Sequence, residues 1–141
     1  MLLDLHNNIK CSRGISPVAA VTNNDAFVSE ILDTNGFLEH EFVAMLGSIA
    51  DADVTFTILV EDGAASNLSD NAAVADEFLL GTESPAFLFS DDNKTFKIGY
   101  TGPKRYVRVT ITPASNTGNI FLAGVWLQSG GRKGPQSTQI V

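Results

Sequence analysis

The clearest feature of the chain is a strict alternation of apolar and polar side chains in two segments. Residues 54–61, VTFTILVE, place an apolar residue at every second position, and residues 106–112, YVRVTIT, do the same. A period of two is typical of a β-strand with one face on a core. Pro113 follows the second segment and is expected to end it, because proline cannot donate a backbone hydrogen bond to a neighbouring strand. Both segments therefore predict half-buried strands.

Weaker alternation predicts a hairpin and one more strand in the first third of the chain. Residues 37–47 alternate after the turn signal Asn35–Gly36, and residues 26–32 are expected to be the hairpin partner of that strand. Residues 17–22 favour a further short strand.

Two more patterns lie in the second half. Residues 87–89 and 96–100 flank SDDNK, a cluster of turn-forming residues, and therefore predict another hairpin. The run 120–127 is apolar almost throughout. Such a run fits either a strand buried on both faces or one buried against a neighbouring subunit.

These segments together predict an all-β fold, an antiparallel β-sandwich or jelly roll of about seven to eight strands with extended N- and C-terminal arms. The sandwich domain is expected to span residues 14–128. Residues 1–13 and 129–141 lack periodicity and are interpreted as an N-terminal arm and a C-terminal tail. Residues 63–83 do not alternate either, and predict a long loop with one helical turn at 70–80. Long loops in compact domains often carry function.

Length and composition fit one globular domain. The chain has 141 residues, 44% of them hydrophobic and 18% charged. No apolar run approaches the roughly 20 residues that a membrane helix needs, so no membrane partner and no secretion are expected. The net charge of −7 argues against nucleic acid as a partner, because phosphate-binding faces depend on clustered Lys and Arg.

The charges are unevenly distributed. All the acidic residues except Asp4 lie between Arg13 and Lys94, an interval without any base. Opposite charges at separate places suit contacts between subunits, although the late bases could equally pair with the acidic strands inside one domain or face solvent. The candidate partner contacts are Lys10, Arg13, Lys104, Arg105, Arg108, Arg132 and Lys133.

Nothing in the sequence assembles a catalytic, cofactor or structural metal site. Cys11 is a single cysteine, so an internal disulfide is excluded, and neither it nor His40 lies in a known nucleophile motif. The pairs Asp51/Asp53 and Asp91/Asp92 lie in predicted turns, where aspartate ordinarily binds its own backbone; calcium binding is the alternative interpretation. Trp126 is expected in the core rather than at an interface.

Two long stretches carry a resemblance to a known family. DADVTFTILVEDGAASNLSDNAAVADEFLLGTE and DDNKTFKIGYTGPKRYVRVTITPASNTGNIFLAGV resemble small proteins encoded in the head-gene modules of tailed bacteriophages and prophages. The resemblance covers residues 14–128. It implies a non-enzymatic capsid cement or decoration protein that is made in the bacterial host cytoplasm and binds the major capsid protein on the virion exterior, often as a homotrimer.

Two other functions remain open from the sequence. One is a tail-tube, head-completion or neck component, which would occupy a single ring or the tail. The other is a carbohydrate-binding β-sandwich that attaches a virion to its host.

Overall fold

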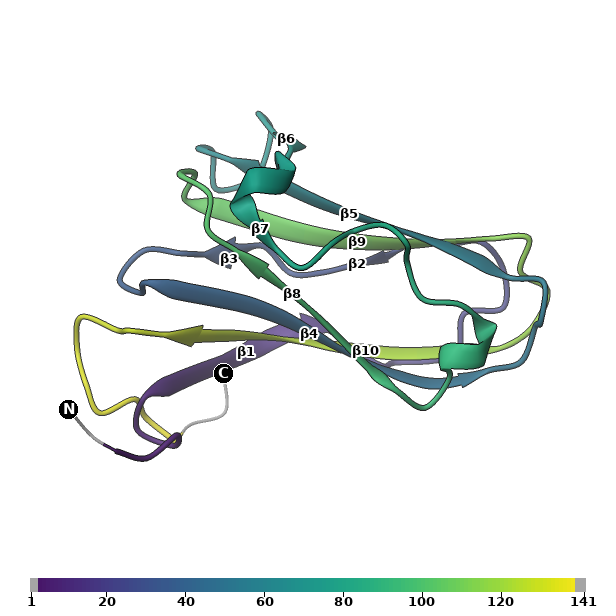
Figure 1. Ribbon diagram of the computed structural model, residues 1–141, viewed down its shortest axis with the longest axis horizontal. Helices are drawn as coiled ribbons and strands as arrows, with labels where there is room; N and C mark the ends of the chain where they lie inside the picture. Colours follow the sequence, from purple (N-terminus) through teal and green to yellow (C-terminus); the bar gives the residue numbers. More distant parts are fainter. Residues whose placement is uncertain (1–2, 139–141) are drawn as a thin grey trace.

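The computed structural model of the chain, in which residues 3–138 are described, consists of two antiparallel sheets packed face to face (Figure 1). Sheet A has the strand order β1-β10-β4-β8-β7, and sheet B has the order β2-β9-β5-β6, with β3 also pairing with β9. The strands are β1 (Ile9–Ile15), β2 (Phe27–Val28), β3 (Leu32–Asp33), β4 (Glu39–Ile49), β5 (Thr55–Gly63), β6 (Ala72–Ala73), β7 (Leu79–Leu80), β8 (Thr95–Tyr100), β9 (Tyr106–Ala114) and β10 (Ile120–Ser129). The predicted all-β antiparallel sandwich is confirmed.

The core fills the space between the sheets. The inward residues of β4 and β9, at alternate positions, are completely or almost completely buried. Trp126 packs edge-on against Phe42, with the ring centroids 5.1 Å apart, and its indole nitrogen donates to the carbonyl oxygen of Glu30 at 3.1 Å. The expected core position of Trp126 is therefore confirmed, and its polar atom is satisfied inside the sandwich.

One buried polar contact joins the two sheets. The hydroxyl of Tyr100 on β8 donates to the carboxylate of Asp62 on β5 at 2.7 Å, and both residues are buried. The same hydroxyl accepts a hydrogen bond from the backbone nitrogen of Lys104 at 3.1 Å. Burial, followed by the bond to Asp62, raises the pKa of Tyr100. The phenol therefore stays neutral and links sheet A to sheet B.

The predicted hairpin between residues 26–32 and 37–47 is wrong. Residues 26–32 break into the short strands β2 and β3, and both pair with β9 of sheet B, whereas β4 lies in sheet A. The break falls at Ser29, whose hydroxyl donates to the carbonyl oxygen of Glu30 and accepts from the backbone nitrogen of Val109. A side chain that binds backbone in this way interrupts the ladder.

The predicted hairpin between 87–89 and 96–100 is also wrong. Residues 89–91 form a 3-10 turn, in which Asp91 accepts from the backbone nitrogen of Leu88 at 2.9 Å, and β8 instead pairs with β4 and β7. Phe87 still reaches the core, where its ring lies 4.4 Å from that of Phe56.

Two smaller expectations also differ from the structure. Residues 17–22 form only a single bridge, between Val21 and Ile120, because Pro17 lacks a donor and turn-forming residues follow at 23–25. Strand β9 continues through Pro113 to Ala114. Pro113 is tolerated there because it lies beyond the end of β2, where β9 has a partner on one side only.

The segments expected as arms contact each other in their described parts. Residues 9–13 belong to β1, which pairs with β10 and forms an edge of sheet A. After β10 the chain folds back, so that the backbone nitrogen of Gln136 donates to Asn7 and that of Arg132 donates to Gly36. The described segments before β1 and after β10 lie at the same end of the sandwich (Figure 1). Residues 1–2 and 139–141 of the expected arms lie outside the described residues.

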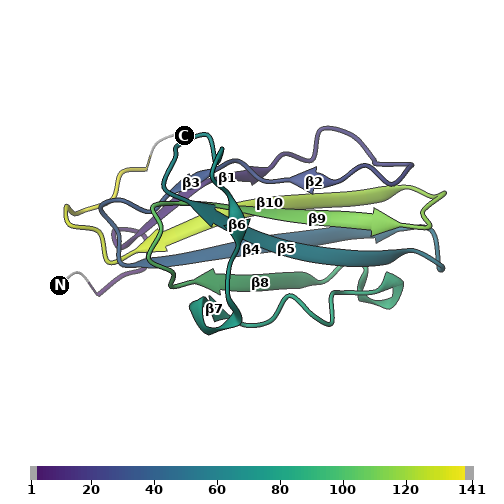
Figure 2. The same cartoon turned by 90° about the horizontal axis from the view of Figure 1, so that it is seen from above.

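The predicted long loop, residues 63–83, runs from sheet B to sheet A. It contains β6, which pairs with β5, and β7, which pairs with β8. A 3-10 turn at Asp76–Phe78 confirms the expected helical turn. Figure 2 shows β7 and β8 along one edge of the sandwich.

Candidate interaction surface

Three of the seven candidate bases form ion pairs within the chain. The pairs are Arg13–Glu30 at 2.6 Å, Arg105–Asp33 at 2.8 Å and Arg108–Glu61 at 2.8 Å. Arg105 binds both carboxylate oxygens of Asp33, which lowers the pKa of that carboxyl. These three bases therefore neutralise acidic residues of their own domain.

The other four candidate bases lie at the end of the sandwich that holds the termini. Lys10 places its ammonium 5.4 Å from the ring centroid of Phe37. Lys104 lies exposed in the turn between β8 and β9, and Arg132 and Lys133 lie exposed after β10. Their role in binding a partner stays a prediction.

The outward faces of the two sheets differ in polarity. On sheet B the outward residues of β5 and β9 are mainly threonines and an ion pair. Thr57 lies opposite Thr112, Leu59 opposite Thr110, and Glu61 opposite Arg108. This is the ordinary composition of a sheet face in contact with water.

On sheet A most outward residues of the adjacent strands β4 and β10 are apolar, and the exceptions Glu39, Glu41 and Ser129 lie at one end of the two strands. We call the following six residues the apolar stripe: Val43, Met45, Phe121, Ala123, Val125 and Leu127. Met45 is 63% exposed and Phe121 is 44% exposed, while the other four are half-buried. The apolar stripe is a candidate interaction surface, because large exposed apolar patches commonly mark binding sites.

At one end of the apolar stripe, a row of residues that includes Leu127 crosses all five strands of sheet A. Leu80 of β7 lies opposite Gly99 of β8, followed by Glu41 of β4, Leu127 of β10 and Cys11 of β1. A Cβ at Gly99 would lie 2.8 Å from a carboxylate oxygen of Glu41 and 2.9 Å from the Cβ of Leu80, so glycine avoids crowding at this position. The missing side chain leaves room for the Glu41 carboxylate on the face of the sheet.

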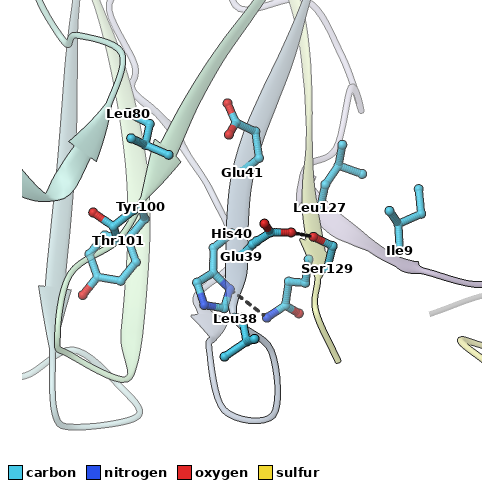
Figure 3. A pocket seen from close by; sticks show the side chains of 11 residues that line it. Ile9, Leu38, Glu39, His40, Glu41, Leu80, Tyr100, Thr101, Leu127 and Ser129 are labelled. Carbon is cyan, nitrogen blue, oxygen red and sulfur yellow. Dashed lines mark hydrogen bonds between the residues drawn. The ribbon is translucent and has the colours of Figure 1, made fainter. Parts of the chain in front are cut away.

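A hollow of about 340 Å³ lies along this row, towards the end of the sandwich that holds the termini (Figure 3). Four apolar side chains line it, together with the carboxylates of Glu39 and Glu41. The apolar residues are Ile9, Leu38, Leu80 and Leu127. In Figure 3 the Glu41 side chain lies between Leu80 and Leu127. The hollow is therefore an apolar depression with acidic groups.

The two carboxylates of the hollow differ in their contacts. Glu39 accepts a hydrogen bond from the hydroxyl of Ser129. Glu41 makes no hydrogen bond or ion pair with any described residue, and burial raises its pKa, against a smaller opposing effect of Lys97. His40 lies between them in sequence and faces inward, where burial lowers its pKa. Glu41 is thus a partly desolvated acid that is influenced by the charge of Lys97 but forms no ion pair with a described residue.

The other candidate chemistry is accounted for by local structure. Asp51 accepts hydrogen bonds from the backbone nitrogens of Asp53 at 2.9 Å and Thr117 at 2.7 Å. These bonds stabilise turns, which is the ordinary role of aspartate there and the simpler interpretation than calcium binding. Within residues 3–138 no three His, Cys, Asp or Glu side chains gather as metal ligands. Cys11 is exposed on β1.

The signal for this surface was present in the sequence as the apolar run 120–127. In the structure β10 lies between β1 and β4 and covers the core with one face only. Burial on both faces within one chain is therefore excluded, and the alternative of burial against another subunit remains.

Comparison with known proteins relates the chain to others through its fold. Among the described residues no helix is long and apolar enough to span a bilayer. No protein-family model matches the chain, and no curated protein matches it. Among solved structures, the chain is similar to a chain of the capsid of Ralstonia phage GP4, with 12% identity over 94% of this chain and 91% of that chain and a TM-score of 0.50. That similarity shows a shared fold over almost the whole length of both chains.

Proposed function

We propose that this chain is a non-enzymatic structural protein of a virion, a cement or decoration protein that binds the outer surface of the major capsid protein shell and stabilises it. The observation that carries the proposal is the fold similarity, over almost the whole length of both chains, to a chain of the capsid of Ralstonia phage GP4. The similarity covers 94% of this chain and 91% of that chain, so it extends over both sheets rather than over a few strands.

The surface of the molecule supports a role in assembly. The apolar stripe leaves one sheet face suited to contact with another protein. On a symmetric shell, many weak contacts of identical copies act together, so a small interface on each copy is sufficient. Contacts by residues 1–13 and 129–141 and association as a homotrimer belong to the same proposal.

The test is the copy number of the protein in purified particles of the phage or prophage that encodes it. Quantitative mass spectrometry against the major capsid protein should give a stoichiometry of the same order as that protein. Particles from a deletion strain should assemble but lose DNA at a lower temperature, and added purified protein should restore their stability.

Other results would point to the other functions. A handful of copies per particle would identify a neck, head-completion or other single-ring component. Absence from particles, or selective binding on a glycan array, would contradict the proposed function.

A further inference from the structure

Strand β10 presents apolar side chains on both faces, yet the sandwich covers only one of them. Ile120, Leu122 and Trp126 face the core and are almost fully buried, while the outward Phe121 is 44% exposed. Across the sheet, Met45 of the neighbouring strand β4 is even more exposed. Sheet B has mainly threonines and an ion pair at the outward positions of β5 and β9, and its exposed apolar residues there are Leu59 and, on β2, Val28. The apolar row over two adjacent strands is therefore a feature of sheet A.

The hollow next to the apolar stripe adds a charge requirement. Glu41 lies partly buried beside Leu80 and Leu127 without an ion pair to a described residue. A Lys or Arg side chain has the matching form, an apolar stem with a cationic end, and would pack its stem on the leucines while its charge meets the carboxylate. The face therefore fits a partner surface that is apolar with a basic side chain.

A second copy of this chain would supply one exposed base, Lys97, for the two carboxylates of the hollow. The face carries two acidic residues, Glu39 and Glu41, and one base, Lys97. Arg13 at its edge already forms an ion pair with Glu30. Two such faces in contact would place acidic groups together, which costs free energy.

The area of the face indicates a small interface. The face is about four strands wide, at a spacing of about 4.8 Å, and about eight residues long, at a rise of about 3.3 Å per residue. Its flat area is therefore about 500 Å² for each partner. A dimer through this face would bury about 1,000 Å² in total, whereas a stable interface typically buries about 1,600 Å². A contact of this size lies among small and transient interfaces, which suits a contact that is repeated over a shell.

We propose that the apolar stripe and the adjoining hollow form the docking surface of this protein, and that its occupant is an apolar surface of the shell protein from which a Lys or Arg side chain enters the hollow and pairs with Glu41. This inference rests on the proposed function and specifies which face of the molecule carries it out. Sheet B then faces away from the shell.

The experiment measures binding of purified protein to particles from the deletion strain. Val125→Asp places a charge in the middle of the apolar stripe, and its matched control Thr112→Asp does the same at an outward position of sheet B. Glu41→Gln removes the charge in the hollow at constant shape, and Glu77→Gln, at an exposed position of the 3-10 turn, is its control. Thermal unfolding establishes that each variant is folded.

The expected result is a loss of affinity of at least tenfold for Val125→Asp and about tenfold for Glu41→Gln, with both controls within twofold of wild type. A readout without substitution is oxidation of Met45 by hydrogen peroxide, followed by mass spectrometry of its peptide. Because Met45 is exposed in the free protein, its oxidation should slow at least fivefold on the particle.

Three outcomes would overturn the inference. Wild-type binding by both sheet A variants, with Met45 equally reactive in both states, would exclude this face while leaving the proposed function intact. Sedimentation of a wild-type dimer that Val125→Asp dissociates, with shell binding unchanged, would identify a second copy as the occupant. Failure of the wild-type protein to bind particles would remove the proposed function together with this inference.

Discussion

Replacement of Tyr100 by phenylalanine tests whether the two sheets are held together by a buried polar contact. The substitution removes only the hydroxyl, which donates to Asp62 at 2.7 Å and accepts from the backbone nitrogen of Lys104 at 3.1 Å. Tyr100 is 2% exposed and Asp62 is 9% exposed, so water has little access to the carboxylate that loses its donor.

The expected loss of unfolding free energy is about 2 kcal/mol, because a buried acceptor without a partner costs roughly 1–3 kcal/mol. The backbone of Lys104 adds little, since that residue is exposed and water replaces the lost bond. For a chain of this size the loss corresponds to a decrease in Tm of roughly 4–8 °C. Urea and thermal unfolding followed by circular dichroism measure both quantities.

Tyr106→Phe is the matched control. The hydroxyl of Tyr106 makes no hydrogen bond to a described residue, so this variant should lie within about 0.5 kcal/mol of wild type. A double-mutant cycle with Asp62→Asn should show coupling, with the double variant less destabilised than the sum of the single ones. Stability of Tyr100→Phe within about 0.5 kcal/mol of wild type, or strict additivity in the cycle, would refute the argument.

Three further predictions follow from buried groups and ion pairs. The pKa of Tyr100 in the folded protein is raised above the value of about 10 for an unfolded tyrosine, so its contribution to stability is complete below pH 10 and decreases above it. In urea titrations from pH 8 to 11, the difference in free energy of unfolding between wild type and Tyr100→Phe should therefore become smaller as the pH rises. Arg108→Ala should lower the free energy of unfolding by about 1–3 kcal/mol, because the carboxylate of its partner Glu61 is only 14% exposed. Arg105→Ala should lower it by less than about 1 kcal/mol, because the carboxylate of its partner Asp33 is 45% exposed. Equal losses in thermal unfolding would contradict this ranking. Gly124→Ala should cost about 1–3 kcal/mol, since the new Cβ would lie 2.5 Å from the buried ring of Phe42; an unchanged Tm would mean that the ring can move.

The strands with strict alternation could be predicted from the sequence because their pattern is local. Strands β5 and β9 contain the segments 54–61 and 106–112 almost completely. The pairing partners of the strands could not be predicted in this way. Strands β2 and β3 pair with β9, which lies roughly 80 residues later in the chain, and no local pattern encodes that choice. Residues 9–13 of β1 fall in the predicted N-terminal arm, because the alternation that starts at Ile9 is short and is interrupted at Arg13 and Gly14.

The candidate surface was predictable only in outline. The sequence predicts the bases as partner contacts because they are charged and lie apart from the acidic residues. In the structure Arg105 and Arg108 instead bind carboxylates 72 and 47 residues away in the sequence, a pairing that no local pattern reveals. The apolar run 120–127 contained the stronger signal and left two interpretations open. Only the sheet order, which leaves the outward face of β10 uncovered, separates burial within the chain from burial against another protein.

The most direct test of the central claim is a cryo-electron microscopy map of the intact particle at a resolution that separates the strands. We expect many copies of the two-layered sandwich on the outside of the shell, with sheet A towards the major capsid protein and a basic side chain of that protein beside Glu41. A particle whose shell lacks this sandwich, or in which sheet B faces the shell and the outward face of sheet A is in contact with solvent, would contradict the account.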